Sequence, residues 1–243
     1  MIWGVDGDII LYSVAFAAEK DVVSYALKSA RSACESIMYD LNADGIEIYL
    51  TGKGNYRDEV TDDYKGNRKN TDKPRHYAEI KKFMIENLDA ILIEGEEADD
   101  AMGYGAVEKG YGIATLDKDL DGVPGWHYNW KKREVYMISP EDADRFFYKQ
   151  MLTGDATDNI PGLFKRLGKK ATKPLYEPLD TMDTPEEMYA HVRAIYSDAY
   201  DDVGMCLDEK EQVLDTWLMK TGRCLWIRRH QNEMWEFPNG KES

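Results

Sequence analysis

The sequence predicts an α/β fold, with a twisted and mostly parallel sheet flanked by helices. Short apolar runs rich in β-branched residues recur along the first 140 residues, and helical patterns separate the early ones. Acidic residues follow several of these runs directly. Strands that alternate with helices are typical of a parallel sheet covered on both faces. A chain of 243 residues is long enough for one large domain with an appendage.

Six apolar runs are predicted to be strands because they are short and rich in β-branched or aromatic residues. They lie at 2–5, 46–50, 90–93, 112–116, 126–128 and 135–138. Helices are expected between the early strands, at about 20–41, 75–88 and 98–109. The sequence therefore places an α/β core at 1–150.

The second part of the chain, 151–243, is predicted to be mainly helical. Ser139 and Pro140 give an N-cap and a first-position proline to a helix that runs to about residue 152. A capping box at Thr184 and Glu187 opens another helix. Two short strands are expected near the end, at 224–228 and 234–237.

The composition indicates a globular protein of a reducing compartment. Hydrophobic residues make up 43% and aromatic residues 12% of the chain, which leaves little room for disorder. Cys34, Cys206 and Cys224 have no paired spacing, so neither a disulfide framework nor a cysteine zinc site is indicated. The chain has no basic leader and no apolar run of membrane-spanning length. We expect a soluble, cytoplasmic protein with no membrane partner.

A formal net charge of −15 argues against a nucleic-acid partner unless positive charge is gathered locally. Two segments gather it, at 64–75 and 164–174. Glycine and proline near the second segment favour a helix N-terminus that faces a phosphate. Each segment could equally be a solvated surface, and Tyr64 could stack on a base or anchor its segment to the core. The cations are Lys65, Arg68, Lys69, Lys73, Arg75, Lys165, Arg166, Lys169, Lys170 and Lys173.

Carboxylates come from four separate segments, three of which follow predicted strands. The carboxyl ends of parallel strands meet at one edge of a sheet, where ligands gather. Clustered carboxylates are costly without a cation, and hard oxygen ligands suit a pair of Mg²⁺ or Mn²⁺ ions. Alternatively, acids before a helix simply interact with its dipole, which is the role we assign to Glu94 and Glu96. The candidate ligands are Asp6, Asp8, Glu97, Asp99, Asp100, Asp117, Asp119, Asp155 and Asp158.

One alternative is a phosphatase. Asp6-Gly7-Asp8 after an apolar strand resembles the nucleophile and acid-base pair of the haloacid-dehalogenase phosphatases. Thr51 and the pair Asp155 and Asp158 follow in that family's order. This interpretation leaves the acids at 97–100 and the basic segment without a task. It also requires a strand before Asp155, where the sequence predicts a helix.

A second resemblance accounts for every motif. Tyr64-Lys65-Gly66-Asn67-Arg68, Glu97-Ala98-Asp99-Asp100, Asp117-Lys118-Asp119 and Gly154-Asp155 through Asp158-Asn159-Ile160-Pro161-Gly162 occur in the order found in the 5′ nuclease, or flap endonuclease, superfamily. The pattern is similar above all to the bacteriophage 5′→3′ exonucleases. The resemblance spans nearly the whole chain and implies the PIN-like core of that superfamily.

The resemblance also implies roles for individual residues. Two Mg²⁺ or Mn²⁺ ions would be held by Asp6, Glu97, Asp99, Asp100, Asp117, Asp119, Asp155 and Asp158. Lys65 and Arg68 would lie on a helical arch at about 61–84 and act with Asp99 in catalysis. A helix-hairpin-helix element at 159–176 would grip duplex DNA. The expected DNA contacts are Arg57, Tyr64, Lys65, Arg68, Lys69, Lys165, Lys169 and Lys170.

The implied activity is 5′→3′ exodeoxyribonuclease, with flap endonuclease and RNase H-like primer removal as further activities, in phage replication or host DNA degradation. The expected partners are duplex DNA with 5′ ends or flaps and RNA-DNA hybrids. Two departures are notable: Thr51 stands where many relatives carry an Asp, for which Asp8 could substitute, and Arg166-Leu167-Gly168 replaces a Gly-x-Gly pattern. A DNA-binding module without catalysis is therefore a third hypothesis.

Overall fold

The computed structural model describes residues 1–68, 72–201 and 207–238. Its residue contacts divide the chain into two compact units, each described here by itself. The α/β unit comprises Met1–Tyr56, Asn70–Ser139 and Ile227–Glu233. The helical unit comprises Arg57–Lys69, Pro140–Trp226 and Met234–Ser243.

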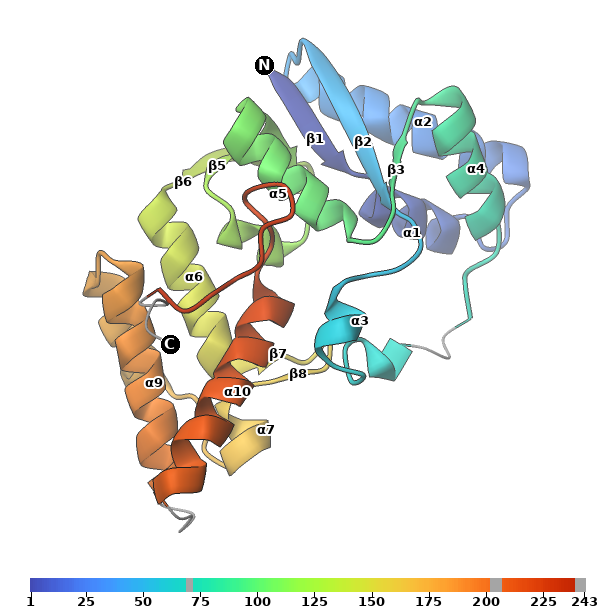
Figure 1. Cartoon of the computed structure of the whole chain (residues 1–243). Coiled ribbons are helices and arrows are strands. Elements are labelled where there is room, and N and C mark those ends of the chain that lie inside the picture. Colours follow the sequence, from blue (N-terminus) through green and yellow to red (C-terminus); the bar gives the residue numbers. More distant parts are fainter. Residues whose placement is uncertain (69–71, 202–206, 239–243) are drawn as a thin grey trace. The chain divides into compact units, whose positions relative to one another are not determined.

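The α/β unit contains a six-stranded sheet in the order β3-β2-β1-β4-β5-β6 (Figure 1). All neighbouring pairs are parallel except the hairpin of β5 with β6. The six predicted strands and the mostly parallel sheet are thus confirmed. The strands are β1 (Ile2–Asp6), β2 (Gly45–Thr51), β3 (Ile91–Ile93), β4 (Gly112–Ala114), β5 (Gly125–Asn129) and β6 (Glu134–Ile138).

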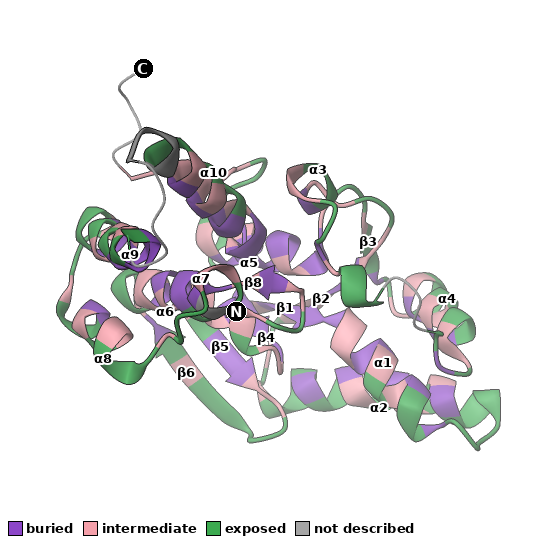
Figure 2. Ribbon diagram, turned by 90° about the horizontal axis from the view of Figure 1, so that it is seen from below, coloured by how far each residue is buried: buried purple, intermediate pink, exposed green. Residues whose placement is uncertain are grey.

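Helices cover both faces of this sheet, and alternate side chains of β2 accordingly belong to two different cores. Ile48 and Leu50 belong to the core under α1 (Gly7–Ala17), α2 (Val23–Asp40) and α4 (Tyr77–Asn87). Tyr49 belongs to the other core, under α5 (Ala98–Lys109). Figure 1 shows these helices on opposite sides of β1 and β2. In contrast, Figure 2 draws the edge strand β6 largely in the exposed colour.

The local sequence explains where α5 begins and ends. Glu97 and Asp100 form a capping box at its start, which satisfies two of the backbone N–H groups that a helix leaves unpaired there. Gly110 ends the helix with a φ of 69°, a left-handed conformation that glycine adopts without a steric penalty. The same carboxylates that suggested a metal site therefore also define a helix terminus.

The helical unit is built around long helices with an aromatic core. Phe147 packs against Tyr148, Trp226 and Trp235, with ring centroids 5.0, 4.9 and 5.5 Å away. Its longer helices are α6 (Pro140–Thr153), α9 (Pro185–Asp201) and α10 (Leu207–Leu225), joined by α7 (Leu163–Leu167), α8 (Lys173–Tyr176) and η3 (Glu177–Thr181). The segment before them contains α3 (Arg57–Val60) and η1 (Gly66–Arg68).

A two-stranded hairpin of β7 (Gly154–Asp155) with β8 (Ile160–Pro161) follows α6 directly. Its two glycines allow the backbones to touch: a Cβ at Gly154 would lie 2.3 Å from the nitrogen of Gly162. No larger residue fits there. The hairpin thereby fixes the loop that carries Asp155 and Asp158.

Two sequence expectations about secondary structure were wrong. The sequence assigned no element to 7–17, where the structure has α1, because a run of large apolar residues with mixed β and helical propensity does not separate helix from strand. The strands expected at 224–228 and 234–237 are absent from the described residues. Leu225 ends α10, and Trp235 is buried in the helical core through its ring rather than through strand pairing.

Of the segment predicted as an arch, 61–84, the described residues contain η1 and the first part of α4. Lys69 lies outside the described residues. Within the parts of the chain that the structure describes, no helix combines the length and apolar character needed to cross a membrane.

Candidate active site

The carboxyl edge of the parallel sheet gathers acidic side chains in the α/β unit. Asp6 is the last residue of β1 and pairs with Tyr49 of β2, which ends two residues later at Thr51. The segments after β3 and β4 lead to Glu97 and Asp117. Because these four strands are parallel, their ends meet at one edge, as the sequence predicted.

Asp6 is the most deeply buried candidate ligand after Asp100, with 3% of its surface exposed. Its Oδ1 accepts from the backbone N–H of Ile9 (3.0 Å), so it caps α1, and its Oδ2 accepts from Thr115 Oγ1 (2.8 Å). Burial, together with the nearby carboxylates of Asp8 and Asp117, raises the pKa of Asp6 to about 7, although these hydrogen bonds lower it. A positive charge at this edge would offset that cost.

Asp8 lies beside the end of β2, where the sequence has Thr51 in place of a carboxylate. Its Oδ2 accepts from the backbone N–H of Thr51 at 2.9 Å. Burial raises the pKa of Asp8, while the bonds to Thr51 and the ammonium of Lys81 lower it. The hydroxyl of Thr51 in turn accepts from the N–H of Ala98 (3.0 Å), so it joins β2 to the start of α5.

The N-terminus of α5 presents Glu97, Asp99 and Asp100, but these acids differ in their surroundings. Glu97 caps the helix, and its Oε1 accepts from Asn55 Nδ2 at 2.8 Å. Asp99 is half-buried in the first turn. Asp100 is 0% exposed, and its two oxygens accept backbone N–H groups from Glu97 (3.2 Å) and Arg228 (3.0 Å). These bonds give Asp100 a structural task that the sequence did not predict.

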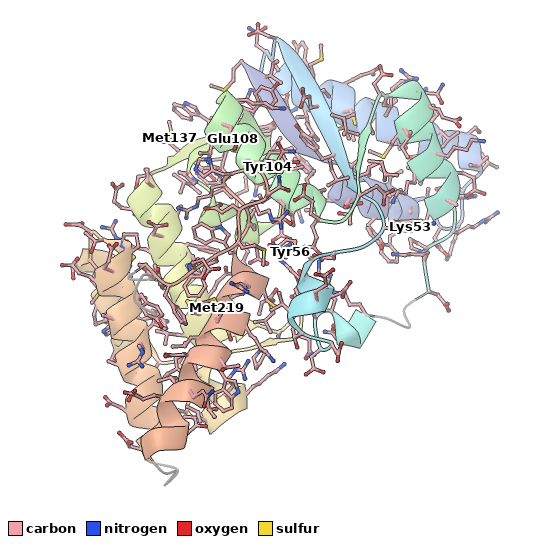
Figure 3. All side chains as sticks on the ribbon, viewed as in Figure 1. Lys53, Tyr56, Tyr104, Glu108, Met137 and Met219 are labelled. Atoms are coloured by element: carbon pink, nitrogen blue, oxygen red, sulfur yellow. The ribbon has the colours of Figure 1, made fainter. Side chains whose placement is uncertain are left out.

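Arg228 connects the C-terminal segment of the α/β unit to the same helix terminus. Its guanidinium forms an ion pair with Glu96 and lies 3.9 Å from the ring centroid of Tyr56. Glu96 also accepts from Tyr104 Oη at 3.1 Å. Tyr56 and Tyr104 are labelled in Figure 3. Sequence reasoning missed Arg228 because nothing in its neighbourhood signals contact with residues 128 positions earlier.

Asp117 and Asp119 begin the short helix η2 (Lys118–Gly122) after β4. Asp117 Oδ1 accepts from the N–H of Asp119 (2.9 Å), and the N–H of Asp117 donates to Thr115 Oγ1 (2.9 Å). Since Thr115 Oγ1 also donates to Asp6, one threonine hydroxyl orders acids from two strand ends. No motif in the sequence singles out Thr115.

The helical unit holds a separate cluster of opposite charges. Asp158 forms ion pairs with Lys65 (3.4 Å) and Arg68 (3.2 Å) and accepts from Tyr64 Oη (3.1 Å). The N–H of Lys65 also donates to the Asp158 carbonyl at 2.9 Å. The structure therefore brings the predicted basic pair together with one predicted acid. Asp155, at the end of β7, accepts from the N–H of Thr157 at 2.8 Å.

Two predicted DNA contacts have internal positions. Arg57 is 2% exposed, and its guanidinium donates to the carbonyls of Cys224 (3.0 Å) and Trp226 (2.6 Å). In this structure its guanidinium therefore faces backbone oxygens, and its contact with a phosphate stays a prediction. Tyr64 is 3% exposed and packs in the helical core, which favours the anchoring alternative. In contrast, Lys165, Lys169 and Lys170 are exposed.

The donor set at the sheet edge fits a hard divalent cation. Its members offer only carboxylate and hydroxyl oxygens, which Mg²⁺ and Mn²⁺ prefer. The pKa of Asp6 and of Asp8 is raised first by burial and then by neighbouring carboxylates, a cost that a bound cation would offset. Among the described residues, no three His, Cys, Asp or Glu side chains converge closely enough to hold an ion as they are placed. Binding would therefore require side chains to move toward the cation.

Comparison with known proteins identifies two phage exonucleases and a bacterial DNA polymerase as relatives. The chain is 28% identical over 184 residues to the exodeoxyribonuclease of Enterobacteria phage T3 and to the exonuclease of Escherichia phage T7, which covers 65% of this chain and 61% of each relative. It is 28% identical over 200 residues to the thermostable DNA polymerase I of Thermus aquaticus, covering 74% of this chain and 24% of the polymerase. The chain thus spans less than two thirds of the length of these relatives. No family model matches.

Solved structures agree about the fold. T5 5′-exonuclease with bound zinc ions has a TM-score of 0.51 at 18% identity, over 91% of this chain and all of that one. Bacteriophage T5 flap endonuclease in complex with DNA and metal ions has a TM-score of 0.50 at 18% identity, over 90% of this chain and 98% of the other. The chain is thus similar in sequence to phage exonucleases and shares the fold of T5 5′-exonuclease, and both findings agree with its resemblance to the 5′ nuclease superfamily.

Proposed function

We propose that the protein is a divalent-metal-dependent 5′→3′ exodeoxyribonuclease that also cleaves 5′ flaps. The observation that carries the proposal is the set of carboxylates at the carboxyl edge of the sheet in a chain that resembles this superfamily. The phosphatase alternative has no support: Asp155 follows the helix α6, not a long strand, and two of the three relatives are exonucleases. RNA-DNA hybrids are a further proposed substrate, and the host cytoplasm is the proposed location if a phage encodes the chain.

Asp6, Glu97, Asp99 and Asp117 are our proposed ligands in the α/β unit, with Asp8 in place of the missing carboxylate at Thr51. The hydrogen bond between Asp8 and Thr51 supports this substitution. The pair of Mg²⁺ or Mn²⁺ ions, when bound, would activate water and stabilise the leaving oxygen. Asp119, Asp155 and Asp158 stay predictions as further ligands. So does Asp100, whose oxygens both accept N–H groups in this structure.

Lys65 and Arg68 are proposed to bind the scissile phosphate and offset the charge that develops on it. Their ion pairs with Asp158 support this role, because a phosphate could replace that carboxylate as their anionic partner. Lys165, Lys169 and Lys170 are proposed to bind the duplex backbone. They lie on and after α7, and α8 follows them, an arrangement compatible with the predicted helix-hairpin-helix at 159–176.

The test is a panel of 5′-labelled substrates: blunt duplex, flap, nick and RNA-DNA hybrid, each with Mg²⁺ or with EDTA. We expect short labelled products in the presence of Mg²⁺ but not in EDTA. The variant Asp99→Asn should form no such products. Glu94→Gln is the matched control, because Glu94 accepts from the N–H of Lys53 and has no proposed ligand role. Cleavage by Asp99→Asn at the parent rate would refute the site, and salt-sensitive binding without turnover would favour the inactive module.

A further inference from the structure

The helical unit contains a cavity of about 410 Å³ that includes Lys165, one of the proposed duplex contacts, but none of the proposed metal ligands. It is lined by the turn that precedes Lys65, by β8, by α7 and by α10. Its volume is within the ~300 to 1,000 Å³ typical of small-molecule sites. It is therefore large enough for a ligand bigger than a single inorganic ion.

Three cations line this cavity, and one carboxylate does. Lys165 and Lys220 are exposed at it, Arg166 is half-buried in its wall, and Asp63 is the acid. Among the described residues, none of the three cations forms an ion pair. This is unusual in a chain with 46 acidic and 31 basic residues, where a lysine or arginine has many potential partners. The cavity has an excess of positive charge that an anion would neutralise.

Arg166 is held in place for such a ligand. Its guanidinium lies 4.7 Å from the ring centroid of Trp217, and one terminal nitrogen approaches Thr221 Oγ1 at 3.5 Å. Its Nε is buried without a hydrogen-bond partner among the described residues. Burial lowers the pKa of Arg166, which means that its charge is incompletely compensated by the surrounding protein. A guanidinium presents paired N–H donors that match the oxygens of a phosphate.

We propose that this cavity binds the phosphate group of a nucleotide, with Arg166, Lys165 and Lys220 as its ligands. The apolar side chains of Ile160 and Trp217, together with the Thr61 hydroxyl, leave room for the attached nucleoside. The phosphate could belong to a free 5′-mononucleotide or to a strand of bound DNA. The second source rests on the proposed function, and the first does not.

Binding is measured by calorimetry in EDTA, so that cleavage and the proposed metal site do not contribute. The probes are deoxyadenosine 5′-monophosphate, inorganic phosphate, deoxyadenosine and a short duplex, each at two salt concentrations. The test variant is Lys165→Ala/Lys220→Ala, which changes only exposed side chains. Arg166→Lys is a second variant that keeps the charge but loses the planar fork. Lys28→Ala, an exposed lysine on α2, is the control.

For a free nucleotide, the monophosphate should bind and deoxyadenosine should not, and the double variant should weaken binding about tenfold, as expected for lost charge-assisted bonds. For a strand phosphate, the double variant should lose affinity only for the duplex. The slope of log affinity against log salt concentration should then be shallower by about 2, because two phosphate contacts are lost. Equal affinity of the double variant and the parent for every probe would overturn the proposal, as would an effect of the same size in Lys28→Ala. Failure of the proposed function would instead be seen as absent cleavage with Mg²⁺.

Discussion

Replacement of Asp100 tests whether this carboxylate holds the α/β unit together. Asp100→Ala removes the acceptor of two buried backbone N–H groups, those of Glu97 and Arg228. An unsatisfied buried donor costs about 1–3 kcal/mol, so the variant should lose roughly 2–6 kcal/mol of unfolding free energy. That is a large part of the ~5–15 kcal/mol of a typical domain. Asp99→Ala, one residue away and half-buried, should lose about 1 kcal/mol or less, the range of a first-turn dipole interaction.

The measurement is urea unfolding in EDTA, combined with hydrogen exchange at the Arg228 amide. Exchange reports the local bond directly, because this N–H should lose its protection in Asp100→Ala. Activity separates the two acids in the other direction, since Asp99→Asn should abolish cleavage while leaving stability near that of the parent. If Asp100→Ala is as stable as Asp99→Ala and keeps the Arg228 amide protected, the structural role assigned to Asp100 is wrong.

Three further predictions follow from single residues. Because burial raises the pKa of Asp6 to about 7, its ionisation opposes folding: the stability it contributes is complete below pH ~4 and is lost as the pH rises through 7. Without metal, the unfolding free energy of Asp6→Asn relative to that of the parent should therefore increase by up to about 4 kcal/mol between pH 4 and pH 8. A difference between the two proteins that does not change with pH would contradict this. Gly7→Ala should lower Tm by an amount that corresponds to a loss of about 1–3 kcal/mol of unfolding free energy, because its Cβ would lie 2.5 Å from the Tyr49 carbonyl oxygen. Gly45→Ala is the control and should have the Tm of the parent, because its Cβ would meet nothing within 4 Å. Arg57→Ala should lower the unfolding free energy by about 3 kcal/mol, because its hydrogen bonds to two carbonyl groups are lost. It should leave the salt dependence of DNA binding unchanged, and a shallower salt dependence would instead support the predicted contact of Arg57 with a phosphate.

The sheet could be predicted from the sequence because its signal is local. Each strand is a short apolar run between turn residues, and parallel connection requires helices between them. The acids at the strand ends followed from the same reasoning, since topology brings parallel ends to one edge. Helix α1 was not predicted, because Asp6 both ends β1 and caps the helix. No linker with turn residues therefore separates the two elements.

Contacts between distant segments could not be predicted in this way. The bond from Arg228 to Asp100 and the bonds from Arg57 to α10 and the residue after it join residues more than 120 positions apart. In the sequence, Arg57 differs in no way from an exposed arginine. Only packing decides whether a cation faces solvent or a row of carbonyl oxygens, and packing is set by the whole chain. The same limitation hid Thr115, whose hydroxyl joins acids from two strand ends.

The acids at the sheet edge consequently divide into two kinds with opposite effects on the metal-free fold. The burial of Asp100 is offset by hydrogen bonds, because each of its two oxygens accepts a backbone N–H group. Asp6 does not, because its hydrogen bonds fall short of offsetting burial and its neighbouring charges. Removing the first kind should destabilise the protein with or without a cation. Removing an acid of the second kind should stabilise the protein in the absence of a cation. With a cation bound, the same change should destabilise it, because the ion offsets the repulsion between the carboxylates and is lost with its ligand. Measuring unfolding of Asp6→Asn and Asp100→Ala with EDTA and then with Mg²⁺ therefore distinguishes carboxylates that build the site from those kept available for an ion.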